Sequence, residues 1–397
     1  MKNLTNLNIF SRFFGSQTAG GILLMLCIIA SLLIANSDAG IYFENFLGKN
    51  LGYENSFLHL KYPILLWIND GLMAIFFLLV GLEIKRELID GELSSVKQAT
   101  LPFFAAIGGM LLPALIYVLL NINGNASSGW GIPMATDIAF AVAVISLLGK
   151  KVPLALKIFL TALAIVDDLG AILVIAFFYT NELNLNYLPY IIGTLILLFA
   201  LNYFNVKPIV FYLIPGAFLW YFIHGFGVHA TIAGVLTAFF LPTTPDEKES
   251  PLEKLEHLLT KPVNFIIMPI FALANTNIRF ESEMTNGIFG GLSMGIILGL
   301  CLGKPIGITL MSYLAVKLKI SELPKDTRWA QVVGLGLLAG IGFTMSIFIA
   351  LLSFDNLEFQ TQAKFSILMA SLISGILGYA TLKFLSSKKK VQKIKAQ

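Results

Sequence analysis

The sequence contains few charged residues: Asp, Glu, Lys and Arg make up only 13% of its 397 residues, against roughly 25% in a soluble domain. Its two cysteines stand far apart in hydrophobic stretches and give neither a disulfide framework nor a metal-ligand spacing. Its four histidines are scattered and form no HExxH zinc motif. These shortages exclude an ordinary soluble domain and a disulfide scaffold, and no cofactor is expected.

Hydrophobic residues are abundant instead, at 57% of the chain, and the mean hydropathy is +0.81. Apolar runs long enough to cross about 30 Å of hydrocarbon recur throughout, which favours helices over a barrel of strands with about ten alternating residues each. The sequence therefore predicts one all-α integral membrane domain over residues 1–397. Twelve spanning helices are expected, at 17–36, 64–84, 101–120, 127–148, 153–179, 187–204, 208–223, 227–240, 258–276, 288–316, 330–352 and 362–385.

The distribution of lysine and arginine predicts the orientation. If the N-terminus is cytoplasmic, 22 of the 27 basic residues fall in inside segments, so both termini are predicted to be cytoplasmic. The basic tail at 386–397 is expected to lie against anionic lipid. Because these segments account for the net charge of +4, no nucleic-acid partner is expected.

Few ionisable residues lie deep within the expected spans: Asp137, Asp167, Asp168 and Lys304. Each costs about 2.5 to 3.5 kcal/mol at the centre of a spanning helix, and the helical rise places all four near the midplane. One acid and one lysine could simply hold two helices together, but three carboxylates with one lysine leave two acids unmatched. Burial favours the protonated carboxyl, whereas a small cation needs the ionised oxygens. Such a site can exchange protons for a cation.

Two of the expected spans contain residues that interrupt helices. Gly131 and Pro133 precede Asp137 in span four, and span eleven has four glycines within nine residues, at positions 334, 336, 340 and 342. Glycines of this kind also occur on close packing faces. Spans four and eleven run in opposite directions, however, which predicts two inverted three-helix repeats, spans three to five and ten to twelve. Asp137 and Lys304 could neutralise the partial charges at the half-helix ends.

Seven segments carry recognisable motifs: FFLLVGLEIKREL (76–88), IPMATDIAFA (132–141), ALAIVDDLGAI (162–172), GVHATIAGV (227–235), SPLEKLEHLL (250–259), LGKPIGI (302–308) and AGIGFTMSIFIA (339–350). Together, and in this order over nearly the whole chain, they resemble the NhaA-type sodium/proton antiporters of bacteria. The resemblance implies a transporter of the inner membrane and not an enzyme. It would expel Na⁺ or Li⁺ against entering protons by alternating access, move net charge, and be active at alkaline pH. The external loop at 38–62 is implied to form a hairpin that pairs two protomers.

The resemblance also implies roles for the buried residues. The paired aspartates, here Asp167 and Asp168, would bind Na⁺ or Li⁺ and protons, with Asp168 the more direct cation ligand. Thr136, Asp137 and Lys304 would form the unwound-helix assembly around them. Since adjacent helical residues project about 100° apart, the two acids cannot share one partner, and Asp167 is expected to pair with Lys304.

A second group of residues is implied in the response to pH. The spacing of Glu83, Arg86 and Glu87, at i, i+3 and i+4, also fits an ordinary interfacial ion-pair network, and the residues alone favour that interpretation. Glu253 and Thr260 depart from the family pattern within the same region, which leaves the pH profile open. The group comprises Glu83, Arg86, Glu87, Glu256 and His257, with His229 as a further candidate.

Other classes of membrane protein fit less well. The DDxxD motif of prenyl-transfer enzymes and the GxGD motif of intramembrane aspartyl proteases are both absent around the paired aspartates. A channel, or a proton-coupled transporter of another small solute or cation, needs a more extensive polar lining. The sequence alone does not exclude these last two.

Overall fold

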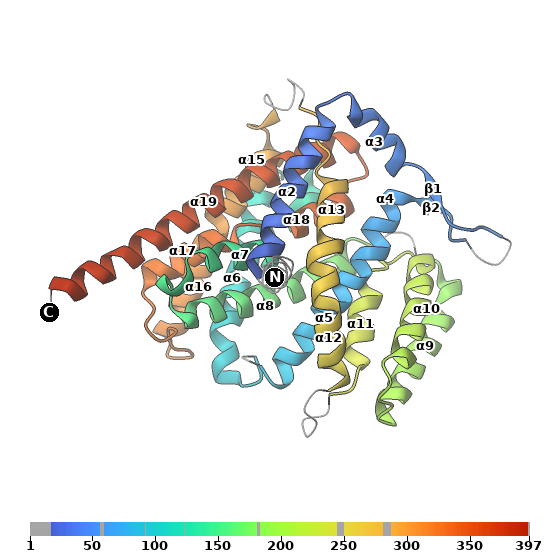
Figure 1. Ribbon diagram of the computed structural model, residues 1–397, viewed down its shortest axis with the longest axis horizontal. Coiled ribbons are helices and arrows are strands. Elements are labelled where there is room, and N and C mark those ends of the chain that lie inside the picture. Colours follow the sequence, from blue (N-terminus) through green and yellow to red (C-terminus); the bar gives the residue numbers. More distant parts are fainter. Residues whose placement is uncertain are drawn as a thin grey trace, which may run out of the picture. The chain divides into compact units, whose positions relative to one another are not determined.

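The computed structural model describes residues 17–55, 59–91, 93–122, 124–180, 183–243, 250–280 and 287–395. In this part of the chain nearly all regular structure is helical (Figure 1). Two compact units are present, each built from separate stretches of sequence. One, called unit 1, takes the described residues of Met1–Met25, Glu92–Ala171 and Phe280–Gln397; the other, unit 2, takes those of Leu26–Gly91 and Ile172–Arg279.

Unit 1 contains two helical segments of about 25 residues, α6 and α8, and several helices that are interrupted. Ser95 begins α6 as its N-cap, and its hydroxyl accepts a hydrogen bond from the Gln98 amide at 3.3 Å. The helical segments are α6 (Val96–Leu120), a 3₁₀ segment (Ser127–Met134), α7 (Ile138–Leu147), a 3₁₀ turn (Gly149–Lys151), most of α8 (Leu154–Phe178), α15 (Gly291–Leu298), a π-helical segment (Gly299–Gly303), α16 (Lys304–Lys317), α17 (Trp329–Ala339), α18 (Phe343–Ser353) and α19 (Leu357–Lys395).

Helices α6 and α16 of unit 1 cross with their backbones in contact. A Cβ atom on Gly108 would overlap the carbonyl group of Gly307, and one on Gly307 would overlap that of Gly108. Glycine at such a crossing lets transmembrane helices approach closely. The crossing lies one turn from Lys304, the first residue of α16, and therefore fixes the start of that helix.

Replacing Gly307 by alanine should lower stability by about 1 to 3 kcal/mol, because the new methyl group has no room against a backbone carbonyl. The measurement is thermal unfolding in detergent. Gly193 in α9 provides the matched control, since a Cβ there has no neighbour within 4 Å. Gly193→Ala should leave stability unchanged or raise it slightly. Equal effects of the two substitutions would contradict a packed crossing.

Unit 2 is built around α5, which runs on from α4 through a π-helical segment and packs against α11 and α12. A single antiparallel strand pair, with Asn50 opposite Pro63, is present among the residues described. Its elements are the greater part of α2 (Gln17–Ala35), α3 (Ala39–Leu47), β1 (Asn50–Leu51), β2 (Tyr62–Pro63), α4 (Ile64–Leu66), a π-helical segment (Trp67–Leu72), α5 (Met73–Ile89), a 3₁₀ turn (Leu185–Tyr187), α9 (Leu188–Tyr203), α10 (Val210–Phe226), α11 (Ile232–Phe240), α12 (Pro251–Pro262), a π-helical segment (Val263–Ile267) and α13 (Met268–Asn275).

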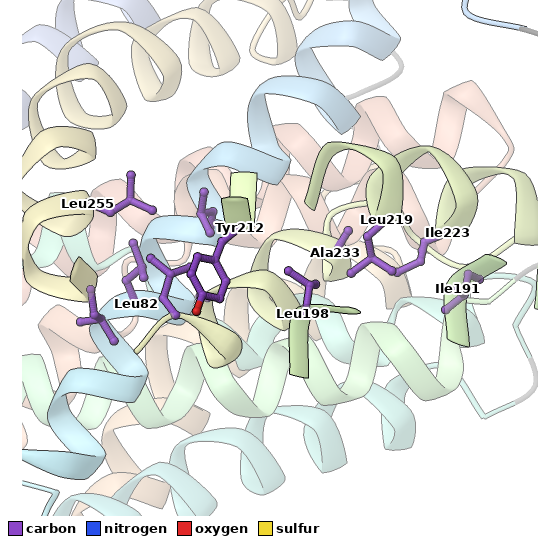
Figure 2. Close-up of a cluster of buried hydrophobic side chains, with 12 residues drawn as sticks. Leu82, Ile191, Leu198, Tyr212, Leu219, Ile223, Ala233 and Leu255 are labelled. Carbon is purple, nitrogen blue, oxygen red and sulfur yellow. The ribbon is translucent and has the colours of Figure 1, made fainter. Parts of the chain in front are cut away.

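A cluster of buried hydrophobic side chains holds unit 2 together (Figure 2). Leu82 of α5 and Leu255 of α12 lie on one side of it, and Leu198 of α9 and Leu219 of α10 on the other. Tyr212 is fully buried among them. Each fully buried Leu contributes about 1.5 to 3 kcal/mol relative to exposure in water, although lipid reduces this gain for a membrane protein.

The expectation of an all-α membrane protein is confirmed, and every expected span falls on a helical segment. Among the described residues, eight helices are long and apolar enough to cross a membrane, or up to ten if bent pairs count as one span. The count of twelve and the inverted repeats stay predictions.

Several boundaries differ from those expected. Span eight was expected from 227, but Gly227 has a φ of +99° and ends α10, so that α11 begins only at Ile232. Helices α6 and α12 begin five and seven residues earlier than expected, because their polar first turns are stabilised by caps and not by apolar residues. The expected tail at 386–397 is helical through Lys395; residues 396–397 lie outside the described chain.

The loop at 38–62 contains α3 and the strand pair β1–β2. A further bridge joins Glu54 and His59, and residues 56–58 lie outside the described part. A hairpin is therefore present, while its pairing of two protomers stays a prediction.

Candidate ion-binding site

The first broken helix of unit 1 comprises the 3₁₀ segment Ser127–Met134 and α7. Between them Ala135 is extended, with a ψ of 151°, and Asp137 has a ψ of 98°, so the backbone leaves the helical region for three residues. Pro133 near the end of the 3₁₀ segment lacks the amide hydrogen that a continuing helix would use. The interruption expected before Asp137 is therefore present.

The second broken helix comprises α17 and α18, whose axes are bent by 48°. Gly340, Ile341 and Gly342 separate them, and the Asp137 amide donates a hydrogen bond to the Ile341 carbonyl at 2.7 Å. A Cβ on Gly342 would lie 3.2 Å from the carbonyl oxygen of Ala135, so glycine there lets the two breaks touch. Gly336, in contrast, lies inside α17 and packs on Pro305. The glycines of this segment thus serve both as a break and as a packing face.

Asp137 joins the N-terminal ends of two half-helices. Its Oδ1 accepts from the Phe140 amide at 2.9 Å, in the first turn of α7. Its Oδ2 accepts from the Thr344 amide at 3.1 Å, in the first turn of α18, and from the Thr344 hydroxyl. Helix N-termini carry partial positive charge, so one carboxylate neutralises both. Only 1% of Asp137 is exposed.

Lys304 and Asp167 form the charged pair of the site. Lys304 Nζ lies 2.6 Å from Asp167 Oδ2, and both residues are fully buried. Lys304 also donates to the Thr136 hydroxyl. That hydroxyl lies 2.7 Å from Asp167 Oδ2 and 2.9 Å from the carbonyl oxygen of Ala339, and it donates its single proton to one of them at a time. Ala339 ends α17, so Lys304 and Thr136 counter the partial negative charge of that helix end.

Asp168 follows Asp167 on α8 and is 1% exposed. Lys304 interacts electrostatically with Asp168 as well, although its direct contact is with Asp167. The second oxygen of Asp167, Oδ1, accepts no hydrogen bond from any described residue. The expected pairing of Lys304 with Asp167 is therefore confirmed, and Asp167 Oδ1 is left to accept a further ligand.

Thr344 was missed from the sequence, although its segment was recognised. A threonine among apolar residues gives no local signal of function, because helical threonines often bond their own backbone. Its position two residues after Gly342, at the start of a half-helix, was the available clue. The π-helical segment Gly299–Gly303, which directly precedes Lys304, was missed as well. Segments of this kind are frequent at functional sites.

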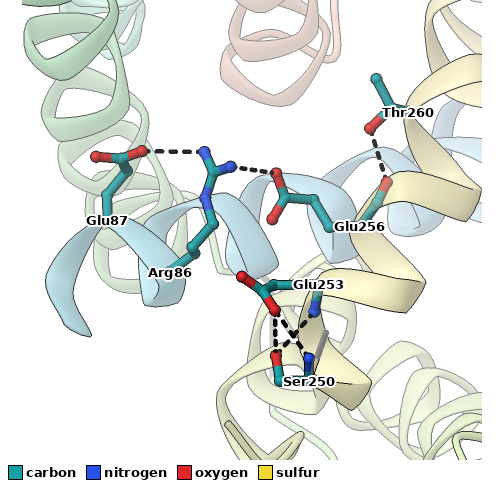
Figure 3. Close-up of polar contacts among 6 residues, drawn as sticks. All are labelled: Arg86, Glu87, Ser250, Glu253, Glu256 and Thr260. Atoms are coloured by element: carbon teal, nitrogen blue, oxygen red, sulfur yellow. Dashed lines mark hydrogen bonds and ion pairs between the residues drawn. The ribbon is translucent and has the colours of Figure 1, made fainter. Parts of the chain in front are cut away.

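Most residues implied in the pH response meet in unit 2 (Figure 3). Arg86 of α5 lies between Glu87, at 3.0 Å, and Glu256 of α12, at 3.1 Å. The side chain of Glu256 is only 7% exposed. Glu83 interacts electrostatically with Glu256 and Arg86, and His257 with Glu256. These five residues are called the Arg86 cluster below.

The two departures from the family pattern stabilise α12. Glu253 accepts from the Ser250 amide at 2.8 Å, while the Ser250 hydroxyl accepts from the Glu253 amide at 3.3 Å, which makes a complete capping box. The Thr260 hydroxyl donates to the Glu256 carbonyl at 2.7 Å. Figure 3 shows both residues turned toward the helix backbone. Both side chains thus make local helix contacts beside the Arg86 cluster.

His229 does not join the Arg86 cluster. It lies in the connection between α10 and α11, where Asp70 and His224 interact with it electrostatically. His224 Nδ1 is 3.4 Å from Asp70 Oδ2. Five of the six residues implied in the pH response therefore form the Arg86 cluster, and His229 lies in a different connection of unit 2.

These features define a multi-pass helical membrane protein with a buried carboxylate–lysine centre where two broken helices meet. The chain belongs to the family described as Na⁺/H⁺ antiporter 1, whose pattern it matches over residues 11–382. It is 62% identical over 393 residues to Na(+)/H(+) antiporter NhaA 2 of Flavobacterium johnsoniae, covering 99% of this chain and 96% of the relative. It is 50% identical to the NhaA of Flavobacterium psychrophilum, covering 95% and 96%. Against the NhaA of Citrobacter koseri the identity is 46%, covering 94% and 97%.

Proposed function

We propose that this protein expels Na⁺ or Li⁺ in exchange for protons across the bacterial inner membrane, by alternating access. The observation that carries the proposal is the centre in unit 1, where Asp167 and Asp168 are buried next to each other and Lys304 pairs with Asp167. A buried carboxylate must be neutralised by a proton, a lysine or a bound cation. Proton and Na⁺ compete for the same oxygens, so occupation by one excludes the other.

Net charge moves in this proposal because two carboxylates can take up two protons, whereas one Na⁺ carries a single charge. Asp168 is the more direct ligand of the cation. Asp167 becomes a second ligand when its ion pair with Lys304 is broken. Asp137, Thr136 and Lys304 hold the half-helices in place around the site. No group of three or more His, Cys, Asp or Glu side chains suited to a metal occurs among the described residues. Hydroxyl, carbonyl or water oxygens would therefore complete the shell of a transported Na⁺.

The test is exchange by the purified protein in liposomes that carry an imposed pH gradient. Na⁺ or Li⁺ should dissipate the gradient, and sugars or amino acids should not. If net charge moves, abolishing the membrane potential with valinomycin and K⁺ should accelerate the exchange. Dissipation by an organic solute but not by Na⁺ would assign the protein to the proton-coupled transport of another substrate.

The Arg86 cluster is proposed to set the pH at which exchange begins, because it combines three carboxylates, one guanidinium and one imidazole around a buried contact. Glu256→Gln should move the half-maximal pH of exchange by about one unit toward acid, since the remaining carboxylates lose a like-charged neighbour. The measurement is the exchange rate in liposomes across pH.

Glu322→Gln is the control for this prediction, because Glu322 pairs with Lys97 at 3.5 Å but is 82% exposed. Its substitution should leave the pH profile in place. An unchanged profile in Glu256→Gln would leave the Arg86 cluster as an ordinary structural network.

The proposed topology places both termini in the cytoplasm. It is supported by the excess of basic residues in the segments that would then face inward. The hairpin formed by β1 and β2 is proposed to pair two protomers into a homodimer, because both strands of a two-stranded sheet are edge strands and edge strands can pair with another chain.

A further inference from the structure

An apolar groove of about 570 Å³ runs along α16 and α17 in unit 1. One wall is formed by Leu302 of the π-helical segment before α16 and by Ile306 and Leu310 of α16, which repeat every four residues and are each about half exposed. Its α17 wall includes Val333 and Leu337. Apart from the polar groups of Thr309, Tyr313 and Trp329 the lining is mainly aliphatic, so the groove offers a ligand a contact surface but few hydrogen bonds.

Aromatic residues close one end of this groove. Tyr313 of α16 and Trp329 of α17 both line it, and their rings meet edge to face with centroids 5.5 Å apart. Lys317 Nζ lies 5.9 Å from the centre of the Tyr313 ring. Tyrosine and tryptophan with a neighbouring lysine are typical of the boundary between hydrocarbon and lipid headgroups.

Positive charge surrounds the same end. The last residue of α16 and the connection from α16 to α17 together contain four bases and two acids, which leaves an excess of positive charge. One of those acids, Glu322, is already paired with Lys97. Arg328 directly precedes Trp329 and is exposed. All four bases are exposed: Lys317 at the end of α16, and Lys319, Lys325 and Arg328 in the connection.

The length of the groove matches one leaflet of a bilayer. From Leu302 to Tyr313 the helical rise amounts to roughly 16 Å, and half of the hydrocarbon core is about 15 Å. An apolar groove of this length that ends in aromatic and basic residues fits a single lipid molecule. A helix of another protein would not need the concentration of positive charge at one end.

We propose that this groove binds an anionic phospholipid, with one acyl chain between α16 and α17 and the phosphate at Lys317 and Arg328. The site is separate from the carboxylate–lysine centre and does not depend on the exchange proposed above. Each base near the headgroup contributes about 1 kcal/mol of electrostatic attraction.

The test measures lipid binding to the purified, delipidated protein by native mass spectrometry and by the shift in unfolding temperature. The probes are phosphatidylglycerol, phosphatidylcholine of the same acyl chains, and inorganic phosphate. Phosphatidylglycerol should bind in preference to phosphatidylcholine, and the double variant Lys317→Gln, Arg328→Gln should weaken it roughly thirtyfold. Ile306→Trp, which fills the groove, should also reduce phosphatidylglycerol binding.

Lys383→Gln is the matched control, because Lys383 also lies over a tyrosine ring, that of Tyr379 at 5.6 Å, but not at this groove. It should leave the binding of phosphatidylglycerol unchanged. Equal binding of the two lipids would overturn the proposal, and so would an equal loss in the control. Saturation by inorganic phosphate alone would show an anion site without an acyl chain and would also overturn it.

Discussion

Asp168→Asn should abolish Na⁺-driven proton release, with a loss of at least about 100-fold, while the protein still folds and inserts. The side chain keeps its size, but the amide can neither take up a proton near neutral pH nor give a cation a charged oxygen. Asp168 is 1% exposed and directly follows Asp167, the partner of Lys304, so the substitution removes one of the two adjacent acids of α8. The measurement is exchange in liposomes, with unfolding temperature as the check on folding.

Two controls accompany this substitution. Asp355→Asn changes an exposed carboxylate and should leave exchange intact. Asp137→Asn keeps an acceptor for the Phe140 amide but loses the charge that faces two helix ends, so it should lower stability more than it alters the apparent affinity for Na⁺. Undiminished exchange in Asp168→Asn would refute its role as the direct cation ligand.

Lys304→Ala should lower the free energy of unfolding by about 3 to 5 kcal/mol, because it leaves Asp167 buried without its countercharge. The amine contacts Asp167 at 2.6 Å as well as the Thr136 hydroxyl, and all three residues are fully buried. The loss should be measured by thermal or chemical unfolding in the same detergent and at the same pH for both proteins. The pH must be constant because an unpaired Asp167 can take up a proton, which reduces the loss of stability.

The double variant Asp167→Asn, Lys304→Met distinguishes a charge effect from a packing effect. Removing both charges should recover most of the stability lost in Lys304→Ala, since neither buried group then lacks a partner. Lys97→Ala serves as the comparison, because it breaks an ion pair with Glu322 in which the two side chains are 80% and 82% exposed. This substitution should lower the free energy of unfolding by almost nothing. Additive losses in the double variant would show that Lys304 acts through packing alone.

The sequence by itself determined the class of protein and singled out the buried charged residues to which the proposed function is assigned. Long apolar runs can only be stable in hydrocarbon, and Asp137, Asp167, Asp168 and Lys304 stand out because a charge there is costly without a use. Both properties belong to single residues and their immediate neighbours along the chain. The family motifs added the roles that spacing could not supply.

The pair of Asp167 and Lys304 was expected from the sequence, but only the tertiary structure decided the other contacts of these residues and the geometry of that pair. Thr344 reaches Asp137 across 207 positions of sequence, and Lys304 reaches Asp167 across 137. Whether a glycine breaks α17 or packs on Pro305 likewise depends on which backbone lies opposite. Charge and hydrophobicity are properties of single residues and can be read from the sequence, whereas hydrogen bonds and ion pairs require distant segments to come within about 3 Å of each other. That distance is set by the packing of whole helices. The sequence could therefore indicate which residues are important, but it could not show the hydrogen bonds between them.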